Sequence, residues 1–206
     1  MPKTPDASSP RAWQRMLSGR RLDLLDPSPL DIELEDIAHG LARVARWNGQ
    51  TLGPHIFSVA QHCLLVEKIA RALQPALSPE QSLFMLLHDA PEYVIGDMIS
   101  PFKAVIGDAY KTVEKRLLEA ILRRFSLPTA DDPALLLLCK KADRAAAFFE
   151  AVALAGFTRS EAERIFGRPA KKALGSSGVE PLPIEAAQQR YIERFRTLQS
   201  QAAAQR

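Results

Sequence analysis

Apolar residues recur three and four positions apart over most of the chain, which is the spacing that places them on one face of an α-helix. In the clearest stretch, Tyr110, Val113, Leu117, Ile121 and Phe125 share a face. This spacing, together with residues typical of helix ends, predicts helices over 36–46, 58–73, 78–89, 110–125, 132–154 and 184–198, and another that begins at Thr158. No run of alternating apolar and polar residues indicates a β-strand, so the predicted fold class is all-α.

Three of the predicted helices begin with a capping box, in which an N-cap hydroxyl and a side chain three residues later each accept from the other residue's backbone N–H. The pairs are Ser58 with Gln61, Ser78 with Gln81, and Thr158 with Glu161. At the far end of the first helix, Asn48-Gly49 after Trp47 is typical of a helix C-terminus.

The length of 206 residues suits a single domain, residues 1–206. Residues 1–10 and 200–206 are predicted to fray. Residues 13–25 carry apolar side chains at irregular spacing and predict only an arm packed on the domain. The segment 167–183 is rich in Gly, Pro, Ser and Lys, which predicts a mobile loop before the C-terminal helix.

Composition excludes several classes of protein. No window approaches the length of a membrane span, and the polar N-terminus lacks the apolar core of a signal peptide. The net charge of +3 is spread over short basic pairs and only 7% of residues are aromatic, so no nucleic-acid surface is indicated. Cys63 and Cys139 lie in apolar sequence, which fits buried thiols in a reduced, cytoplasmic protein.

Chemically active side chains are concentrated in residues 88–97, directly after an apolar run. Adjacent side chains diverge on a regular helix, so His88 and Asp89 can turn toward one point only where the helix ends. Pro91 supplies that end, because it has no backbone N–H and disfavours helical geometry at Ala90. For this pair alone, a solvated helix end is the simpler interpretation, and half of a metal site is the alternative.

Two more residues change that balance. His62 lies early in one predicted helix, and Asp143 lies inside the long apolar one, where an unpaired carboxylate would be costly to bury. Taken singly, His62 is more often an ordinary histidine, and Asp143 could pair with Arg144 or a lysine. Together with His88 and Asp89, they place candidate ligands on three helices, which favours a metal site.

The order of a His, a His-Asp pair and a distant Asp resembles the HD superfamily of metal-dependent phosphohydrolases, and within it the bacterial 5′-deoxynucleotidases. The similar segments are Arg46-Trp47, 58–62, 88–92, Gly96-Asp97, 101–103, 110–114 and 140–143. Residues 13–45 also resemble the N-terminal arm of an uncharacterised phage and proteobacterial subgroup. The resemblance implies an HD-type helical domain.

Differences from other branches of the HD superfamily narrow the set of enzymes that the chain resembles. Enzymes that hydrolyse guanosine alarmones carry an acid where this chain has Tyr93, and the Gly-Tyr-Pro segment of the cyclic-dinucleotide hydrolases is absent. Dinuclear sites use extra histidines, and only His39 and His55 remain, so a single metal ion is expected. Gln61 stands where the deoxynucleotidases can carry an acid.

By resemblance, one divalent cation is held by His62, His88, Asp89 and Asp143. Mixed nitrogen and oxygen ligands suit Mn, Co, Zn or Fe better than Mg. Asp89 and Glu92 would be the catalytic carboxylates, with Glu92 orienting the attacking water or transferring its proton. A carboxylate stabilised at a helix start is the alternative interpretation of Glu92.

The resemblance also implies the substrate contacts. Arg46 would bind phosphate, Trp47 would pack on the sugar and penalise a 2′-hydroxyl, and Asp97 would accept from the 3′-hydroxyl. Lys103 and Lys140 are weaker phosphate candidates, since lysines are more often simply solvated. A core anchor is the alternative interpretation of Trp47.

The predicted function is a metal-dependent phosphohydrolase of deoxyribonucleotides, acting first on 5′-monophosphates with release of phosphate. A deoxynucleoside triphosphate hydrolase on the same metal site is the alternative enzyme, and a non-catalytic nucleotide-binding regulatory module is the alternative from another class. The expected partners are a nucleotide and, by family resemblance, a second copy of the chain in a homodimer, with no nucleic acid and no membrane.

Overall fold

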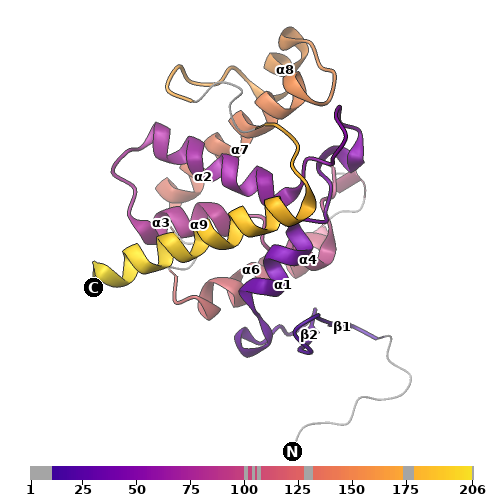
Figure 1. Ribbon diagram of the computed structural model, residues 1–206, viewed down its shortest axis with the longest axis vertical. Helices are drawn as coiled ribbons and strands as arrows, with labels where there is room; N and C mark the ends of the chain where they lie inside the picture. Colours follow the sequence, from indigo (N-terminus) through magenta and orange to yellow (C-terminus); the bar gives the residue numbers. More distant parts are fainter. Residues whose placement is uncertain are drawn as a thin grey trace, which may run out of the picture.

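The computed structural model describes residues 11–99, 102–103, 105, 108–127, 132–173 and 179–205 (Figure 1). The predicted tail 1–10, the middle of the predicted loop 167–183, and Pro101 of the predicted turn lie outside the described residues. Nearly every element in the described part is helical, which confirms the all-α class.

The described helices follow the predicted ones closely. They are α1 (Leu34–Leu41), α2 (Val59–Leu73), α3 (Pro79–Leu87), α4 (Glu92–Ile95), α6 (Asp108–Arg124), α7 (Pro133–Ala153), α8 (Arg159–Phe166) and α9 (Ile184–Ala204), with short 3₁₀ helices η1 (Pro29–Asp31) and η2 (Arg46–Gly49). Helix α9 continues to Ala204, beyond the predicted end, because Ala202 is buried against the rest of the domain.

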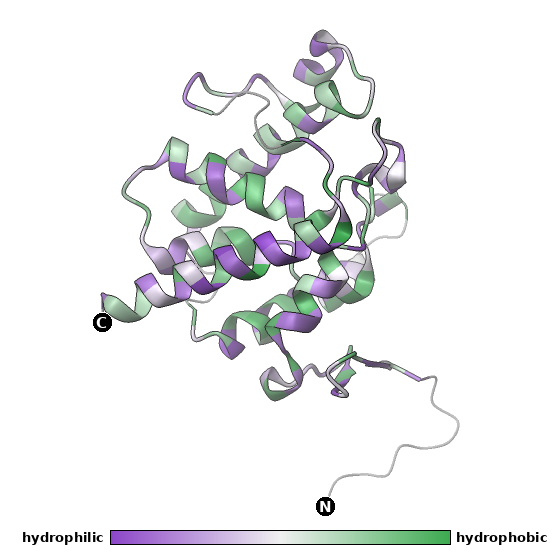
Figure 2. Cartoon of the chain, in the orientation of Figure 1, coloured by the Kyte–Doolittle hydropathy of each residue, from purple (hydrophilic) through white to green (hydrophobic). Residues whose placement is uncertain are grey.

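Helix α2 lies at the centre of one hydrophobic core and packs against α3, α7 and α9. Figure 1 shows α9 crossing the molecule beside α1 and α3, which it also contacts. Figure 2 shows hydrophilic and hydrophobic residues mixed along every long helix, as expected where one face is buried and the other is in water. The buried Tyr191 of α9 donates its hydroxyl to the carbonyl oxygen of Leu86 at 3.1 Å, which ties α9 to the last turn of α3.

Helices α1 and α4 approach so closely that only glycine fits between them. A Cβ added to Gly40 of α1 would lie 2.7 Å from the carbonyl oxygen of Tyr93 in α4. Helix α4 begins at Glu92, so this close contact involves the helix that carries Glu92.

Two predictions near the N-terminus are wrong in detail. The arm 13–25 contains an antiparallel hairpin of β1 (Trp13–Arg15) and β2 (Arg21–Asp23), whose strands are too short to show alternation in the sequence. The helix predicted over 36–46 ends at Leu41, because Ala45 pairs with Ser58 in an isolated β-bridge and Arg46 donates its N–H to Phe57 at 2.8 Å. These long-range hydrogen bonds replace the last helical turn.

Two of the capping boxes are complete, at Ser78 and at Thr158. At Ser58 only half of the predicted box forms: the hydroxyl accepts from the backbone N–H of Gln61, but the Gln61 amide turns elsewhere. It donates to the carbonyl oxygen of Glu180 at 2.8 Å and accepts from the N–H of Leu182 at 3.2 Å. Gln61 therefore attaches the segment before α9 to the start of α2.

Both cysteines are free and buried, as predicted. None of the described helices combines the length and apolar character that crossing a membrane requires.

Candidate metal centre

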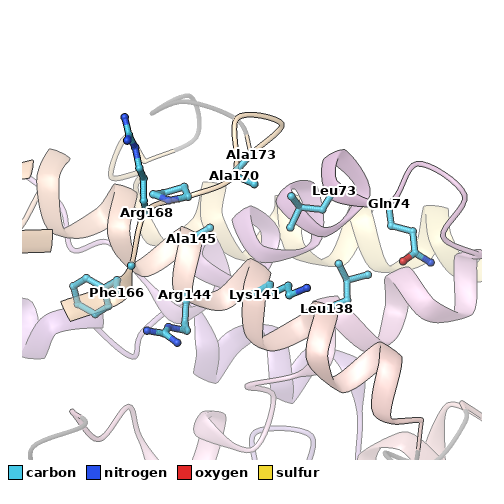
Figure 3. Close-up of a pocket in the computed structure, with 12 residues that line it drawn as sticks. Leu73, Gln74, Leu138, Lys141, Arg144, Ala145, Phe166, Arg168, Ala170 and Ala173 are labelled. Carbon is cyan, nitrogen blue, oxygen red and sulfur yellow. The ribbon is translucent and has the colours of Figure 1, made fainter. Parts of the chain in front are cut away.

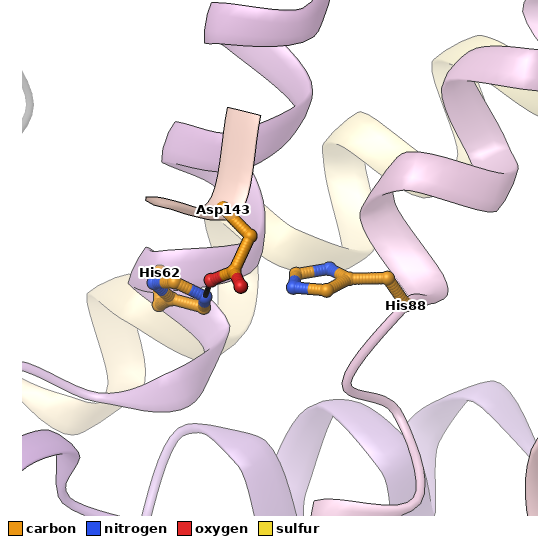
Figure 4. A group of neighbouring side chains, drawn as sticks. All are labelled: His62, His88 and Asp143. Atoms are coloured by element: carbon orange, nitrogen blue, oxygen red, sulfur yellow. Dashed lines mark ion pairs between the residues drawn. The ribbon is translucent and has the colours of Figure 1, made fainter. Parts of the chain in front are cut away.

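Three helices bring the predicted metal ligands to one point. His62 lies in the first turn of α2, His88 caps the C-terminus of α3, and Asp143 lies in the middle of α7. Figure 4 shows the three side chains directed toward one another, and one ligand atom from each lies within 4.8 Å of the others. Asp89, in the turn after α3, places an oxygen 3.4 Å from Nε2 of His62 and 3.2 Å from Nε2 of His88.

The spacing of these atoms suits a bound cation. Nε2 of His62 also lies 3.2 Å from Oδ1 of Asp143, yet neither buried Nε2 makes a hydrogen bond with acceptable geometry to another described residue. Ligands about 2.1 Å from a single ion lie roughly 3.0 to 3.4 Å from one another, which matches these separations. His62, His88 and Asp143 thus form a group that could hold a metal ion, with Asp89 beside it.

In both imidazole rings, Nδ1 has a hydrogen-bond partner on the side away from the ligand cluster. Nδ1 of His88 lies 2.9 Å from the carbonyl oxygen of Met85, and Nδ1 of His62 lies 2.5 Å from Oε1 of Glu150. A carboxylate or carbonyl behind a histidine fixes its ring orientation and raises its basicity as a ligand. The two Nε2 atoms are therefore aimed at the common point before any ion arrives.

The charged groups of the ligand cluster shift one another's pKa values. Burial disfavours ionisation of all three groups, but the carboxylates around His62 and His88 outweigh it and raise the pKa of each histidine well above its ordinary value. In turn the two histidines hold the pKa of Asp89 well below its ordinary value, against the effect of burial. Without a metal, protons take the place of the cation, so metal binding must displace them.

Glu150 is the residue of this site that the sequence interpretation missed. It lies on α7 and is fully buried, and Arg46 and His62 hold its pKa at about 2 although burial opposes this. Its position two helical turns after Asp143 places both carboxylates on one face of α7. That spacing, in a segment as apolar as 145–151, was the signal available in the sequence.

Arg46 and Trp47 reach the site through an unusual backbone. The β-bridge at Ala45 leads into η2, where Trp47 and Asn48 have φ of 58° and 50°, in the left-handed region. Arg46 then donates from Nε to Glu150 at 3.2 Å and from Nη1 to Asp97 at 2.9 Å. The indole N–H of Trp47 also donates to Glu150, at 3.0 Å.

One cavity of about 760 Å³ adjoins the ligand cluster. Eight of the residues singled out in the sequence line it: Arg46, Trp47, Asp89, Glu92, Asp97, Lys103, Lys140 and Asp143. The sequence interpretation missed its apolar wall, formed in part by Phe157, Ile165 and Phe166 at the two ends of α8. The Trp47 ring lies 5.7 Å from that of Phe157 and 5.9 Å from that of Phe166, so Trp47 both anchors this wall and faces the cavity.

Glu92 is a carboxyl group of the cavity whose pKa is strongly raised. Its side chain is buried, and one of its oxygens has no hydrogen-bond partner among the described residues. Burial, followed by the negative charges of Asp89 and Asp97, raises the pKa of Glu92 to about 9. The nearest cation is Lys103, whose Nζ lies 3.7 Å away. Glu92 therefore holds a proton at neutral pH until another positive charge enters the site.

A second cavity of about 620 Å³ lies on the other side of Arg144 and Phe166, which line both cavities. It contains Lys141, Arg144 and Arg168 and no acidic residue. Figure 3 shows Arg144 and Arg168 extending in opposite directions, so their charges do not converge on one ligand position. Of these two cavities, only the first is lined by carboxylates.

No protein-family model matches the chain, but it is similar in sequence to known proteins. The uncharacterized protein YfdR of Escherichia coli K12 is 32% identical over 99 residues, which cover 48% of this chain and 49% of that protein. The uncharacterized protein RCAP_rcc00048 of Rhodobacter capsulatus is 57% identical over 159 residues, which cover 77% of this chain and 81% of that protein. At this identity and coverage, the chain belongs to the same family as the Rhodobacter capsulatus protein.

Proposed function

We propose that the protein is a metal-dependent phosphohydrolase of the HD superfamily that removes phosphate from deoxyribonucleoside 5′-monophosphates. The observation that carries this proposal is the single cavity in which the ligand cluster meets Arg46, Trp47, Glu92 and Asp97. These groups include what hydrolysis of a small phosphate ester needs: a candidate cation site, the basic side chains of Arg46 and Lys103, and a carboxyl group that can carry a proton.

The proposed cofactor is one divalent transition metal ion, either Mn, Co, Zn or Fe. Two imidazole nitrogens with carboxylate oxygens suit these ions better than Mg, which prefers oxygen ligands and its own waters. The chemistry supplied by such a cation is Lewis acidity toward phosphoryl oxygen and water. The two remaining histidines, His39 and His55, do not belong to the ligand group of His62, His88 and Asp143, which supports a single ion.

Glu92 is the proposed proton carrier. The pKa of about 9 applies to the site without a cation, and a cation beside Glu92 would lower it and leave the carboxylate available as a base. The ionised Glu92 would take one proton from the attacking water and then deliver that proton to the 5′-oxygen that leaves with the deoxyribose. Lys103 lies close enough to stabilise the carboxylate in the interval when the proton has left.

Arg46, Asp97 and Trp47 are the proposed substrate contacts. The Arg46–Asp97 ion pair at 2.9 Å presents a donor beside an acceptor, which suits a phosphate oxygen and the 3′-hydroxyl of the same nucleotide. Trp47 is held by its indole N–H and by two phenylalanine rings, so it offers the sugar a rigid wall. A rigid wall can reject a 2′-hydroxyl, because it cannot move aside for the extra oxygen.

The test is hydrolysis of a panel of nucleotides in the presence of Mn, Co, Zn or Mg. Release of phosphate from deoxyribonucleoside monophosphates is the expected result. Triphosphate release from deoxynucleoside triphosphates would favour the alternative enzyme, and nucleotide binding without turnover would favour a regulatory module. In an active preparation, Glu92→Gln should lower kcat by about 10² to 10⁴ and leave the metal content unchanged.

A further inference from the structure

We propose that Glu150 is a positioning residue that couples the metal centre to Arg46 and Trp47, so that metal binding orders the phosphate-binding end of the cavity. This inference rests on the metal site of the proposed function, but not on hydrolysis itself. Glu150 lines neither cavity, and the sequence resemblance gives it no role.

The two oxygens of Glu150 serve two different parts of the site. Oε1 lies 2.5 Å from Nδ1 of His62, whose Nε2 faces the ligand cluster. Oε2 accepts from Arg46 at 3.2 Å and from Trp47 at 3.0 Å. One rigid carboxylate therefore joins α2 to η2, and neither end can shift without moving an oxygen that holds the other.

This arrangement is more than the carboxylate needs for its own stability. A buried charge requires a compensating partner, and Glu67 shows the simple solution in this fold: it is also buried and is held by Arg194 at 3.1 and 2.6 Å. Glu150 instead divides its oxygens between a candidate metal ligand and two candidate substrate residues. Trp47, whose indole N–H donates to the same oxygen, has a left-handed backbone conformation in η2.

The coupling follows from hydrogen bonding. A cation on Nε2 of His62 would fix the orientation of the ring, and with it the Nδ1–H that Oε1 accepts, so the plane of the carboxylate would be held. A fixed plane holds Oε2 in line with Nε of Arg46 and Nε1 of Trp47. The metal centre and the phosphate-binding arginine should therefore be ordered together.

The experiment uses Trp13→Phe as the reference protein, because it leaves Trp47 as the only tryptophan of the two in the chain. Zn²⁺ is the probe, since it does not quench fluorescence by itself, and its binding is measured by calorimetry and by Trp47 emission. We expect Zn²⁺ to change the Trp47 emission of the reference. In the same background, Glu150→Gln should weaken Zn²⁺ binding by about 10 to 100-fold. It should also abolish the emission change at saturating Zn²⁺, and weaken the binding of inorganic phosphate to the Zn²⁺-loaded protein.

Glu67→Gln is the matched control, because it also removes a buried carboxylate that holds an arginine, but its partners Arg194 and Arg71 do not line the cavity. It should keep both Zn²⁺ affinity and the emission change. A Glu150→Gln protein that binds Zn²⁺ like the reference and retains the emission change would overturn the inference. If that variant does not fold, the reference decides alone: no change in Trp47 emission at saturating Zn²⁺ also overturns it. Zn²⁺ binding without nucleotide hydrolysis would instead refute only the proposed function.

Discussion

Replacing Glu92 with glutamine should stabilise the metal-free protein at alkaline pH. Glu92 holds its proton in the folded state up to a pKa of about 9, whereas an unfolded glutamate releases it near 4.5. Between these values the unfolded state binds fewer protons, so the free energy of unfolding falls as the pH rises. Glutamine is neutral in the folded and the unfolded state, so Glu92→Gln removes this pH-dependent fall in the free energy of unfolding.

The size of the effect follows from that difference in proton affinity. At about 1.4 kcal/mol for each tenfold change, moving the pKa from 4.5 to about 9 gives a ceiling of about 6 kcal/mol. Lys103, 3.7 Å away, can move closer to the ionised carboxylate, and the adjoining cavity can admit water. These responses reduce the penalty, and we expect a gain on the order of 2 kcal/mol for Glu92→Gln at pH 9.

The measurement is urea unfolding of both proteins in the presence of a chelator at pH 5, 7 and 9. The difference between them should be small at pH 5 and grow with pH. Glu67→Gln is the contrasting control: it should lose stability, because it leaves Arg194 without its buried partner. Equal stabilities of wild type and Glu92→Gln at all three pH values would show that Glu92 ionises normally, and would remove the basis for its role as a proton carrier.

Three further predictions concern the metal, the sugar and the fold. His88→Ala and Asp143→Ala should each abolish metal retention and hydrolysis, and full metal content in both variants by elemental analysis would refute the ligand assignment. Trp47→Ala should raise activity on ribonucleotides relative to deoxyribonucleotides, whereas an unchanged ratio in a folded variant would leave Trp47 as a core anchor only. Gly40→Ala should destabilise the protein by about 1 to 3 kcal/mol, because the new Cβ would lie 2.7 Å from the Tyr93 carbonyl oxygen. A thermal melt unchanged by Gly40→Ala would show that α1 can move away from α4 at little cost.

The sequence by itself determined the helices and most of their ends. Amphipathic spacing and capping are local properties, because they depend on residues within one turn of each other. The complete capping boxes at Ser78 and Thr158 confirm this, as does the end of α3 at His88 before Pro91. The candidate ligands were also recognisable, because an aspartate inside an apolar helix and a His-Asp pair at a helix end each suggest a partner, although the Asp143 side chain is only partly buried.

Where those local rules failed, a long-range contact had replaced a local one. The first helix stops at Leu41 because the chain that follows pairs with residues 57–59, and Gln61 leaves its capping box to hold the backbone of Glu180 and Leu182. In both cases the partner lies more than one helical turn away, so the spacing rules that predict helices and capping boxes do not include it. In both cases, tertiary hydrogen bonds override the local preference for a helical turn or a capping box.

Only the tertiary structure decided how the site works. Glu150 looks in the sequence like one more residue of a long helix, and its role depends on η2 and α2 arriving at its two oxygens. The raised pKa of Glu92 likewise depends on burial by distant elements and on the approach of Asp97. Local sequence specifies which groups are present, whereas hydrogen-bond partners and desolvation depend on which helices pack together, and these set their chemistry.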